Sequence, residues 1–152
     1  MSSEISVLVP LAEGFEELEA ITIIDILRRA EINVVVAGLS DRSIRASHNT
    51  VHLADMTLDE ALQYNYEMVV LPGGLPGADH LNADPRIHKL IQKMAADGKY
   101  TAAICAAPKV LADAGILDGR EATSYPGFLQ GSSATVIDDA DVVTDGKIIT
   151  SR

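Results

Sequence analysis

The sequence is poor in cysteine and in aromatic residues. Its 152 residues include one cysteine, Cys105, and no tryptophan. A single thiol cannot form an internal disulfide or a site of several thiolate ligands, and it is typical of a reducing compartment. The four histidines, at positions 48, 52, 80 and 88, lack the close spacing of metal ligands and are interpreted as surface residues. We therefore predict no metal site.

Positive charge is also scarce. Lysine and arginine number 12 against 22 acidic residues, which gives a net charge of -10, and no basic run could follow a phosphate backbone. This argues against nucleic acid as a partner. No apolar run approaches the length of a membrane span, and Met1–Glu4 lack the basic start of a signal peptide. We predict a soluble, cytoplasmic protein without a membrane partner.

Apolar runs of strand length alternate with helical patterns along the chain, as expected for a parallel sheet covered on both faces. The patterns predict buried strands at 5–11, 34–37, 68–71 and 100–104, an edge strand at 52–56, and short strands at 122–125, 141–144 and 147–151. They predict helices at 16–30, at 57–65, from Pro85 towards Gly98, and from Cys105 to Ala114. The turn Asp145-Gly146 predicts an antiparallel hairpin. We expect one domain over residues 1–152: a flavodoxin-like, three-layer α/β sandwich with a mostly parallel sheet and a late antiparallel hairpin.

The stretch from Tyr100 to Pro108 contains the cysteine and runs from a strand of small residues into a helix. A thiol at such a turn lies beside unpaired backbone N–H groups and the positive end of a helix dipole, both of which favour the thiolate. Cys105 is therefore a candidate nucleophile. The local sequence leaves open the alternative that it is a small buried hydrophobe among alanines.

Loops at the carboxyl ends of parallel strands meet at one edge of the sheet, where α/β proteins bind ligands. The segments Gly14–Glu19, Gly73–Gly74 and Cys105 all follow predicted strands and are expected to meet there. Glu19 lies at the border of the apolar stripe of its helix, whereas the nearby acidic residues are explained by the helix dipole alone. We therefore expect a raised pKa for Glu19, which would let it exchange a proton with Cys105.

Four motifs together closely resemble the ThiJ/PfpI superfamily, and more narrowly the branch that contains the parkinsonism-associated protein. The motifs are Gly14-Phe-Glu-Glu-Leu-Glu19, Leu71-Pro-Gly-Gly74, Ala102-Ala-Ile-Cys-Ala-Ala-Pro108 and Thr150-Ser-Arg152. The resemblance extends from Ile5 to Arg152.

This resemblance implies roles for single residues. Cys105 would be the nucleophile, Glu19 the protonated carboxylic acid that hydrogen-bonds it, and the N–H groups of Gly74 and Ala106 the pair that holds an oxyanion or an oxidised sulfur. Gly73 is a further candidate. Tyr125 stands where the parkinsonism-associated protein has a histidine, and its role is either hydrogen bonding or packing, because tyrosine is a poor base near neutral pH.

Two departures from the family pattern narrow the function. Peptidase-like members carry a histidine directly after the cysteine, and Ala106 stands there in this sequence, so a cysteine peptidase is the weakest of the readings. Family members also continue into a C-terminal helix after Thr-Ser-Arg. We expect this chain to be one piece of a longer protein that was truncated or cleaved after Arg152. The remaining C-terminal fragment is then a candidate partner, bound as a separate polypeptide.

The resemblance implies an enzyme that needs no cofactor and acts on 2-oxoaldehydes such as methylglyoxal, or on their adducts with proteins, as glyoxalases and deglycases do. The alternative function is an oxidative-stress sensor or chaperone that works through oxidation of Cys105. Both functions use the same residues. The family is commonly dimeric, so we also expect a homodimer.

Overall fold

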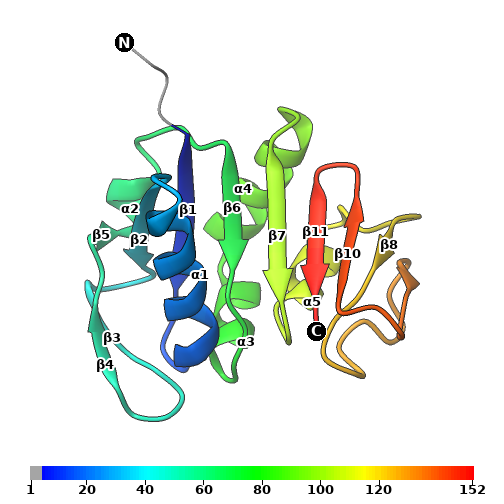
Figure 1. Ribbon diagram of the computed structural model, residues 1–152, viewed down its shortest axis with the longest axis horizontal. Coiled ribbons are helices and arrows are strands. Elements are labelled where there is room, and N and C mark those ends of the chain that lie inside the picture. The colour runs from blue at the N-terminus through cyan, green and yellow to red at the C-terminus, as the bar shows by residue number, and fades with distance from the viewer. Residues whose placement is uncertain (1–4) are drawn as a thin grey trace.

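The structure is a computed structural model that describes residues 5–152 (Figure 1). Met1–Glu4, on which the signal-peptide argument rests, lie outside the described residues. A seven-stranded sheet in the order β10-β11-β7-β6-β1-β2-β5 forms the middle layer. Its strands are β1 (Ser6–Leu11), β2 (Asn33–Gly38), β5 (Met56–Thr57), β6 (Met68–Leu71), β7 (Tyr100–Ile104), β10 (Val142–Asp145) and β11 (Ile148–Ser151).

The pairing confirms the predicted sheet. Neighbouring strands are parallel except for β10 and β11, which form the antiparallel hairpin through the Asp145-Gly146 turn. The carboxyl ends of the parallel strands point to the lower edge of the sheet in Figure 1. The loops that follow β1, β6 and β7 therefore lie at one edge.

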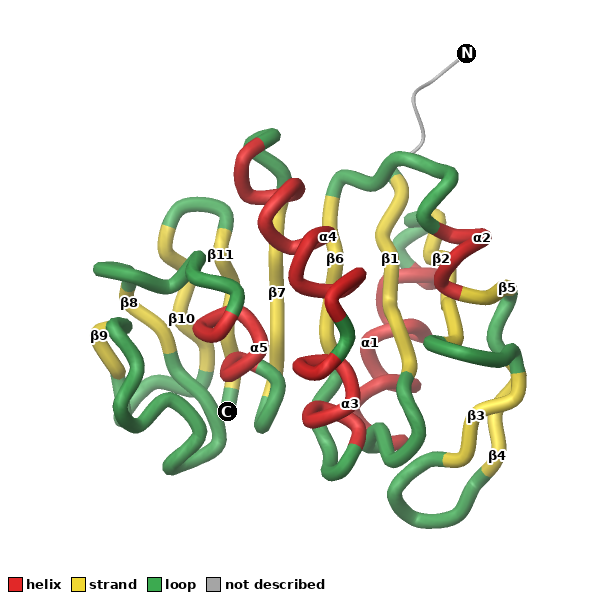
Figure 2. The backbone as a smooth tube through the Cα atoms, turned by 180° about the vertical axis from the view of Figure 1, so that it is seen from behind, coloured by secondary structure: helices red, strands yellow, loops and turns green. Residues whose placement is uncertain are grey.

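Helices cover both faces of the sheet, which confirms the three-layer arrangement. They are α1 (Glu17–Arg29), α2 (Leu58–Ala61), α3 (Gly77–Ala83), α4 (Pro85–Ala96) and α5 (Pro108–Asp113). Helix α1 lies in front of the sheet in Figure 1, whereas Figure 2 shows α3, α4 and α5 on the opposite face. None of the helices formed by residues 5–152 has the length and apolar character needed to cross a bilayer.

Each face of the sheet packs into its own apolar core. In β1, Leu8 belongs to the core beneath α3, α4 and α5, whereas Val7 and Val9 belong to the core beneath α1. In β6, Leu71 and Val70 alternate in the same way. Because successive side chains point to opposite faces, a strand buried on both sides needs an uninterrupted apolar run.

The helix-start signals in the sequence correspond to observed caps. Thr57 and Glu60 form the predicted capping box, although α2 ends at Ala61 rather than near residue 65. The Asp84 side chain accepts a hydrogen bond from the N–H of Arg86, which opens α4. At the start of α1, the Glu16 side chain accepts the N–H of Glu19 at 3.0 Å. Acidic residues therefore supply two of these helix caps.

Three parts of the fold differ from the sequence prediction. Helix α3 was not predicted, since its first residue follows Pro76 and no side chain caps it. The predicted edge strand at 52–56 is wrong: β4 (Val51–Leu53) pairs with β3 (Ser43–Arg45) in a separate antiparallel hairpin, and β5 joins the main sheet beside β2. The predicted strand at 122–125 is shorter: β8 (Glu121–Ala122) pairs with β9 (Thr135–Val136), and the N–H of Thr123 bonds instead to the side chain of Thr150.

Candidate functional site

Cys105 occupies a sharp turn directly after β7. Its φ of 63° lies in the left-handed region, which costs a residue with a Cβ about 1–2 kcal/mol. Hydrogen bonds hold this conformation on both sides: the Cys105 N–H donates to the carbonyl of Ser151 at 3.0 Å, and the Cys105 carbonyl accepts the N–H of Tyr125 at 2.8 Å. The thiol is therefore displayed from a constrained backbone and is not part of the regular strand.

Glu19 reaches the same place from the first turn of α1. Its Oε1 accepts the backbone N–H of Gly73 at 2.9 Å, and its carboxyl group is hydrogen-bonded to the Cys105 thiol. Burial raises the pKa of Glu19, and the negative charge of Glu16 adds to this, while the two hydrogen bonds oppose it without cancelling it. The net direction is the one that the helical position of Glu19 led us to expect.

The thiol itself is less acidic than the sequence led us to expect. The N–H groups of Ala106 and Gly74 face the sulfur and lower the pKa of Cys105, but burial raises it more strongly, and an ionised Glu19 raises it further. The expected help from a helix dipole is small, because α5 begins only at Pro108 and has six residues. Burial thus disfavours the charged form of both groups, and because they interact directly, Cys105 and Glu19 titrate as a coupled pair.

Gly73 and Gly74 leave no room for a side chain. A Cβ on Gly73 would lie 2.7 Å from the Cβ of Cys105 and 2.7 Å from Oε1 of Glu19. Gly74 has a φ of +90°, and a Cβ there would lie 2.5 Å from the backbone nitrogen of Glu16. Glycine at both positions lets the loop after β6 pack directly against the thiol and the carboxyl group.

Tyr125 adjoins the site through its backbone and not through its phenol group. Its side chain is 55% exposed, and its ring lies edge-on to that of Phe128 with 6.0 Å between the centroids. Within residues 5–152 the Tyr125 hydroxyl makes no recorded hydrogen bond. What Tyr125 contributes is the N–H that supports the turn at Cys105.

A hydrogen-bonded cluster beside the site was not recognised from the sequence. Glu17 accepts hydrogen bonds from the hydroxyl groups of Ser47 at 3.1 Å and Thr50 at 2.7 Å, and from the backbone N–H of His48. Although burial alone would raise it, the hydrogen bonds from Thr50 and His48 hold the pKa of Glu17 well below its usual range. The cluster fastens the β3–β4 hairpin to the start of α1. No spacing in the sequence could have shown it, since its members lie about thirty residues apart.

Glu16, Glu17 and His48 each offer one potential metal-ligating atom, and these atoms lie within 4.8 Å of one another. The ring nitrogen Nδ1 of His48 is 3.0 Å from Glu17 and 3.5 Å from Glu16. The oxygens of Glu17 are already engaged by the hydrogen bonds described above. The group is thus accounted for as a hydrogen-bonded anchor of the hairpin.

Comparison with known proteins finds close relatives over nearly the whole chain. Protein dj-1beta of Drosophila melanogaster is 41% identical over 150 residues, which cover 97% of this chain and 80% of that protein. Its crystal structure superposes with a TM-score of 0.94 at 40% identity and covers 99% of this chain and 82% of that one. A protein named deglycase from Pyrococcus abyssi is 32% identical over 148 residues, covering 96% of this chain and 89% of that protein.

Protein DJ-1 homolog B of Arabidopsis thaliana is 40% identical over 148 residues, or 96% of this chain. The chain spans only 34% of the length of that relative. Residues 5–152 match the sequence model of the DJ-1/PfpI family. The motifs around Glu19, Gly74 and Cys105 all lie inside that range. The chain therefore belongs to the DJ-1/PfpI family.

Proposed function

We propose that this protein is a cofactor-independent cysteine enzyme that acts on 2-oxoaldehydes such as methylglyoxal, or on their adducts with amines and thiols. The observation that carries the proposal is the hydrogen-bonded pair of Cys105 and Glu19, in which burial favours the protonated form of the carboxyl group. A thiolate beside a carboxylic acid combines a nucleophile with a proton source. The relative named deglycase supports the same class of reaction.

In the first step, the Cys105 thiolate attacks the aldehyde carbon and forms a carbon–sulfur bond. The electron pair of the carbonyl moves to its oxygen, and the N–H groups of Gly74 and Ala106, which face the sulfur, stabilise this oxyanion. Glu19 then gives its proton to the oxyanion. The product is a hemithioacetal, and Glu19 is left as a carboxylate.

In the second step, the Glu19 carboxylate removes the proton from the carbon that carries sulfur, and the same proton is delivered to the neighbouring carbonyl carbon. The hydroxyl proton on the first carbon's oxygen passes to the oxygen of the neighbouring carbon. This converts the hemithioacetal into a thioester of a 2-hydroxy acid. Water then cleaves the thioester, which releases the 2-hydroxy acid and restores the protonated pair. For methylglyoxal the sum is one aldehyde plus one water to one lactate and one proton, with no external oxidant or reductant.

Chiral chromatography of lactate formed from methylglyoxal tests this proposal. We expect lactate from the unaltered protein and a loss of about 10²-fold or more in Cys105→Ser and in Glu19→Gln. Glu121→Gln serves as the matched control, because Glu121 is an exposed glutamate on β8, and it should retain full activity. Absence of lactate from protein whose thiol titrates fully would overturn the glyoxalase function.

A second function, oxidative sensing, is favoured by the two N–H groups directed at the sulfur. Hydrogen peroxide would convert the thiolate to a sulfenate, with reduction of the peroxide to water, and a second peroxide would produce a sulfinate. The N–H groups and a protonated Glu19 would hydrogen-bond the sulfinate oxygens. A sensor loses its free thiol stoichiometrically with peroxide and releases no lactate from methylglyoxal, so the two functions separate on turnover.

We also propose that the protein forms a homodimer through α1 and the β3–β4 hairpin. These elements adjoin through the hydrogen bond from Thr50 to Glu17, and they expose large apolar side chains: Leu18 is 75% exposed and Leu53 is 71% exposed. Light scattering should give a dimer for the unaltered protein and a monomer for Leu18→Glu. Val142→Glu, at a 57% exposed position on β10, should remain dimeric. A monomer at every concentration of the unaltered protein would contradict this proposal.

A further inference from the structure

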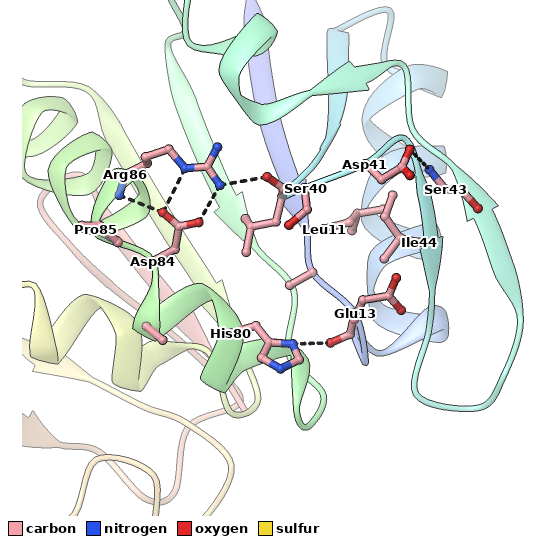
Figure 3. Close-up of a pocket in the computed structure, with 13 residues that line it drawn as sticks. Leu11, Glu13, Ser40, Asp41, Ser43, Ile44, His80, Asp84, Pro85 and Arg86 are labelled. Carbon is pink, nitrogen blue, oxygen red and sulfur yellow. Dashed lines mark hydrogen bonds and ion pairs between the residues drawn. The ribbon is translucent and has the colours of Figure 1, made fainter.

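A cavity away from the thiol opens at the carboxyl ends of β1 and β2, beside α3 and α4 (Figure 3). Its volume is about 630 Å³, which lies in the range of about 300–1,000 Å³ of small-molecule sites. Its lining includes neither Cys105 nor Glu19.

The floor of this cavity is apolar. Leu11 and Ile44 line it, but they are 1% and 3% exposed and are already withdrawn from water. The apolar surface that stays accessible is that of Leu39, Ala83 and Pro85. A ligand seated here would therefore remove apolar surface from water, and an alkyl or aromatic group is the body that this floor accepts.

Two carboxylates stand at the rim. Figure 3 shows Glu13 and Asp41 on either side of Ile44. Oε2 of Glu13 accepts the N–H of Arg45 at 3.0 Å, and Oδ1 of Asp41 accepts the backbone N–H groups of the two residues that follow it. These bonds orient both side chains. In the part of the chain that the structure describes, the second oxygen of each carboxylate has no recorded hydrogen-bond partner.

The guanidinium group of Arg86 lines the cavity, but its N–H donors are used in contacts within the protein. It donates to Asp84 at 2.7 Å, to Asp59 at 2.9 Å and to the carbonyl of Leu39 at 2.8 Å. These contacts neutralise its charge and occupy its planar donor set. The other basic side chain of the lining, His80, is hydrogen-bonded through Nδ1 to the carbonyl of Glu13 at 2.9 Å. The rim therefore presents the two carboxylates as its free charged groups.

We propose that this cavity binds a small organic cation, with a primary ammonium or guanidinium group at the carboxylates of Glu13 and Asp41 and a short apolar or aromatic body on the accessible surface of Leu39, Ala83 and Pro85. The proposal rests on the cavity, its apolar floor and the complementary charge of its rim. It is independent of the thiol chemistry proposed for Cys105. Binding involves no covalent step.

Three ligands that share a phenylalkyl body but differ in charge test this site. Their binding is followed by the amide chemical shifts of the ¹⁵N-labelled protein. The probes are 2-phenylethylammonium, the neutral 2-phenylethanol and the anionic 3-phenylpropanoate. We expect the ammonium ion to shift amides around Glu13, Asp41 and Ile44, to bind about tenfold more tightly than the alcohol, and to bind more weakly as salt is raised. The anion should cause no shifts there.

Variants of the rim complete the experiment. Asp41→Asn and Glu13→Gln should each weaken binding of the ammonium ion about fivefold or more, whereas Asp139→Asn, which removes the same charge at an exposed position, should not. The spectrum of each unliganded variant reports whether it is folded, and the alkylation rate of Cys105 reports whether the thiol site is intact. Equal binding of ammonium and alcohol, unchanged binding by both rim variants, or no shifts at about 10 mM ammonium ion would each overturn the proposal.

Discussion

Gly73→Ala adds a single methyl group between the two reacting side chains of the proposed site. The new Cβ would lie 2.7 Å from the Cβ of Cys105, 2.7 Å from Oε1 of Glu19 and 2.9 Å from the carbonyl oxygen of Ile104. Favourable contacts between such atoms need about 3.5–4.0 Å, so about 1 Å of overlap must be relieved. The carbonyl of Ile104 belongs to β7 and cannot move freely. We therefore expect Glu19 and Cys105 to be pushed apart.

Two magnitudes follow for Gly73→Ala. Overpacking of this kind lowers the free energy of unfolding by about 1–3 kcal/mol. A displacement of about 1 Å at reacting groups costs about 10²-fold in rate. Gly73 does not adopt a positive φ, so these effects come from steric crowding and not from backbone strain.

Gly98→Ala provides the matched control. Gly98 has a φ of +71°, and apart from its two chain neighbours no residue of the described range 5–152 has an atom within 4 Å of the position that its Cβ would occupy. Alanine there should cost about 1–2 kcal/mol of unfolding free energy through backbone strain and leave the thiol unaffected. The measurements are urea unfolding, the pH dependence of iodoacetamide alkylation at Cys105, and lactate formation. A Gly73→Ala protein with unchanged stability and an unchanged alkylation profile would refute the packing argument.

Further predictions concern buried hydroxyl groups, protonation and backbone strain. Thr101 is buried, and within residues 5–152 its hydroxyl has no hydrogen-bond partner, so Thr101→Val should raise the free energy of unfolding by about 1–2 kcal/mol. Thr150→Val should lower it by a similar amount, because the N–H of Thr123 loses its acceptor. Chemical denaturation that ranks the two variants the other way would contradict this. Because folded Glu19 binds its proton more tightly than the unfolded chain does, the free energy of unfolding should fall as pH rises from the ordinary pKa of 4.5 through the raised value. Glu19→Gln should lack this fall, and parallel pH–stability curves for the two proteins would be evidence against a raised pKa. Cys105→Gly should be more stable than Cys105→Ala by about 1 kcal/mol, the reverse of the usual order, because glycine adopts the left-handed conformation at this turn without strain; the usual order in thermal unfolding would show that the turn is unstrained.

The sequence alone determined the elements whose signals are local. The apolar run before Leu11 indicated a strand buried on both faces, because its alternate side chains enter two cores. The capping residues Thr57 and Asp84 marked helix starts through bonds to N–H groups a few residues away. The same local reasoning placed Glu19, Gly74 and Cys105 at one edge of the sheet, since parallel strands end together.

Only the tertiary structure decided what depends on contacts between distant segments. The strand expected at 52–56 divides between two sheets because Val51–Leu53 finds a partner in Ser43–Arg45, while Met56 pairs with β2. The pKa of the thiol rises because burial and the charge of Glu19, contributed from α1, outweigh the two N–H groups. The anchoring of the hairpin by Glu17 and the acidic rim of the cavity beside α3 and α4 likewise arise where loops far apart in the chain meet. Burial and electrostatics are properties of the assembled surroundings, and no local pattern of residues contains them.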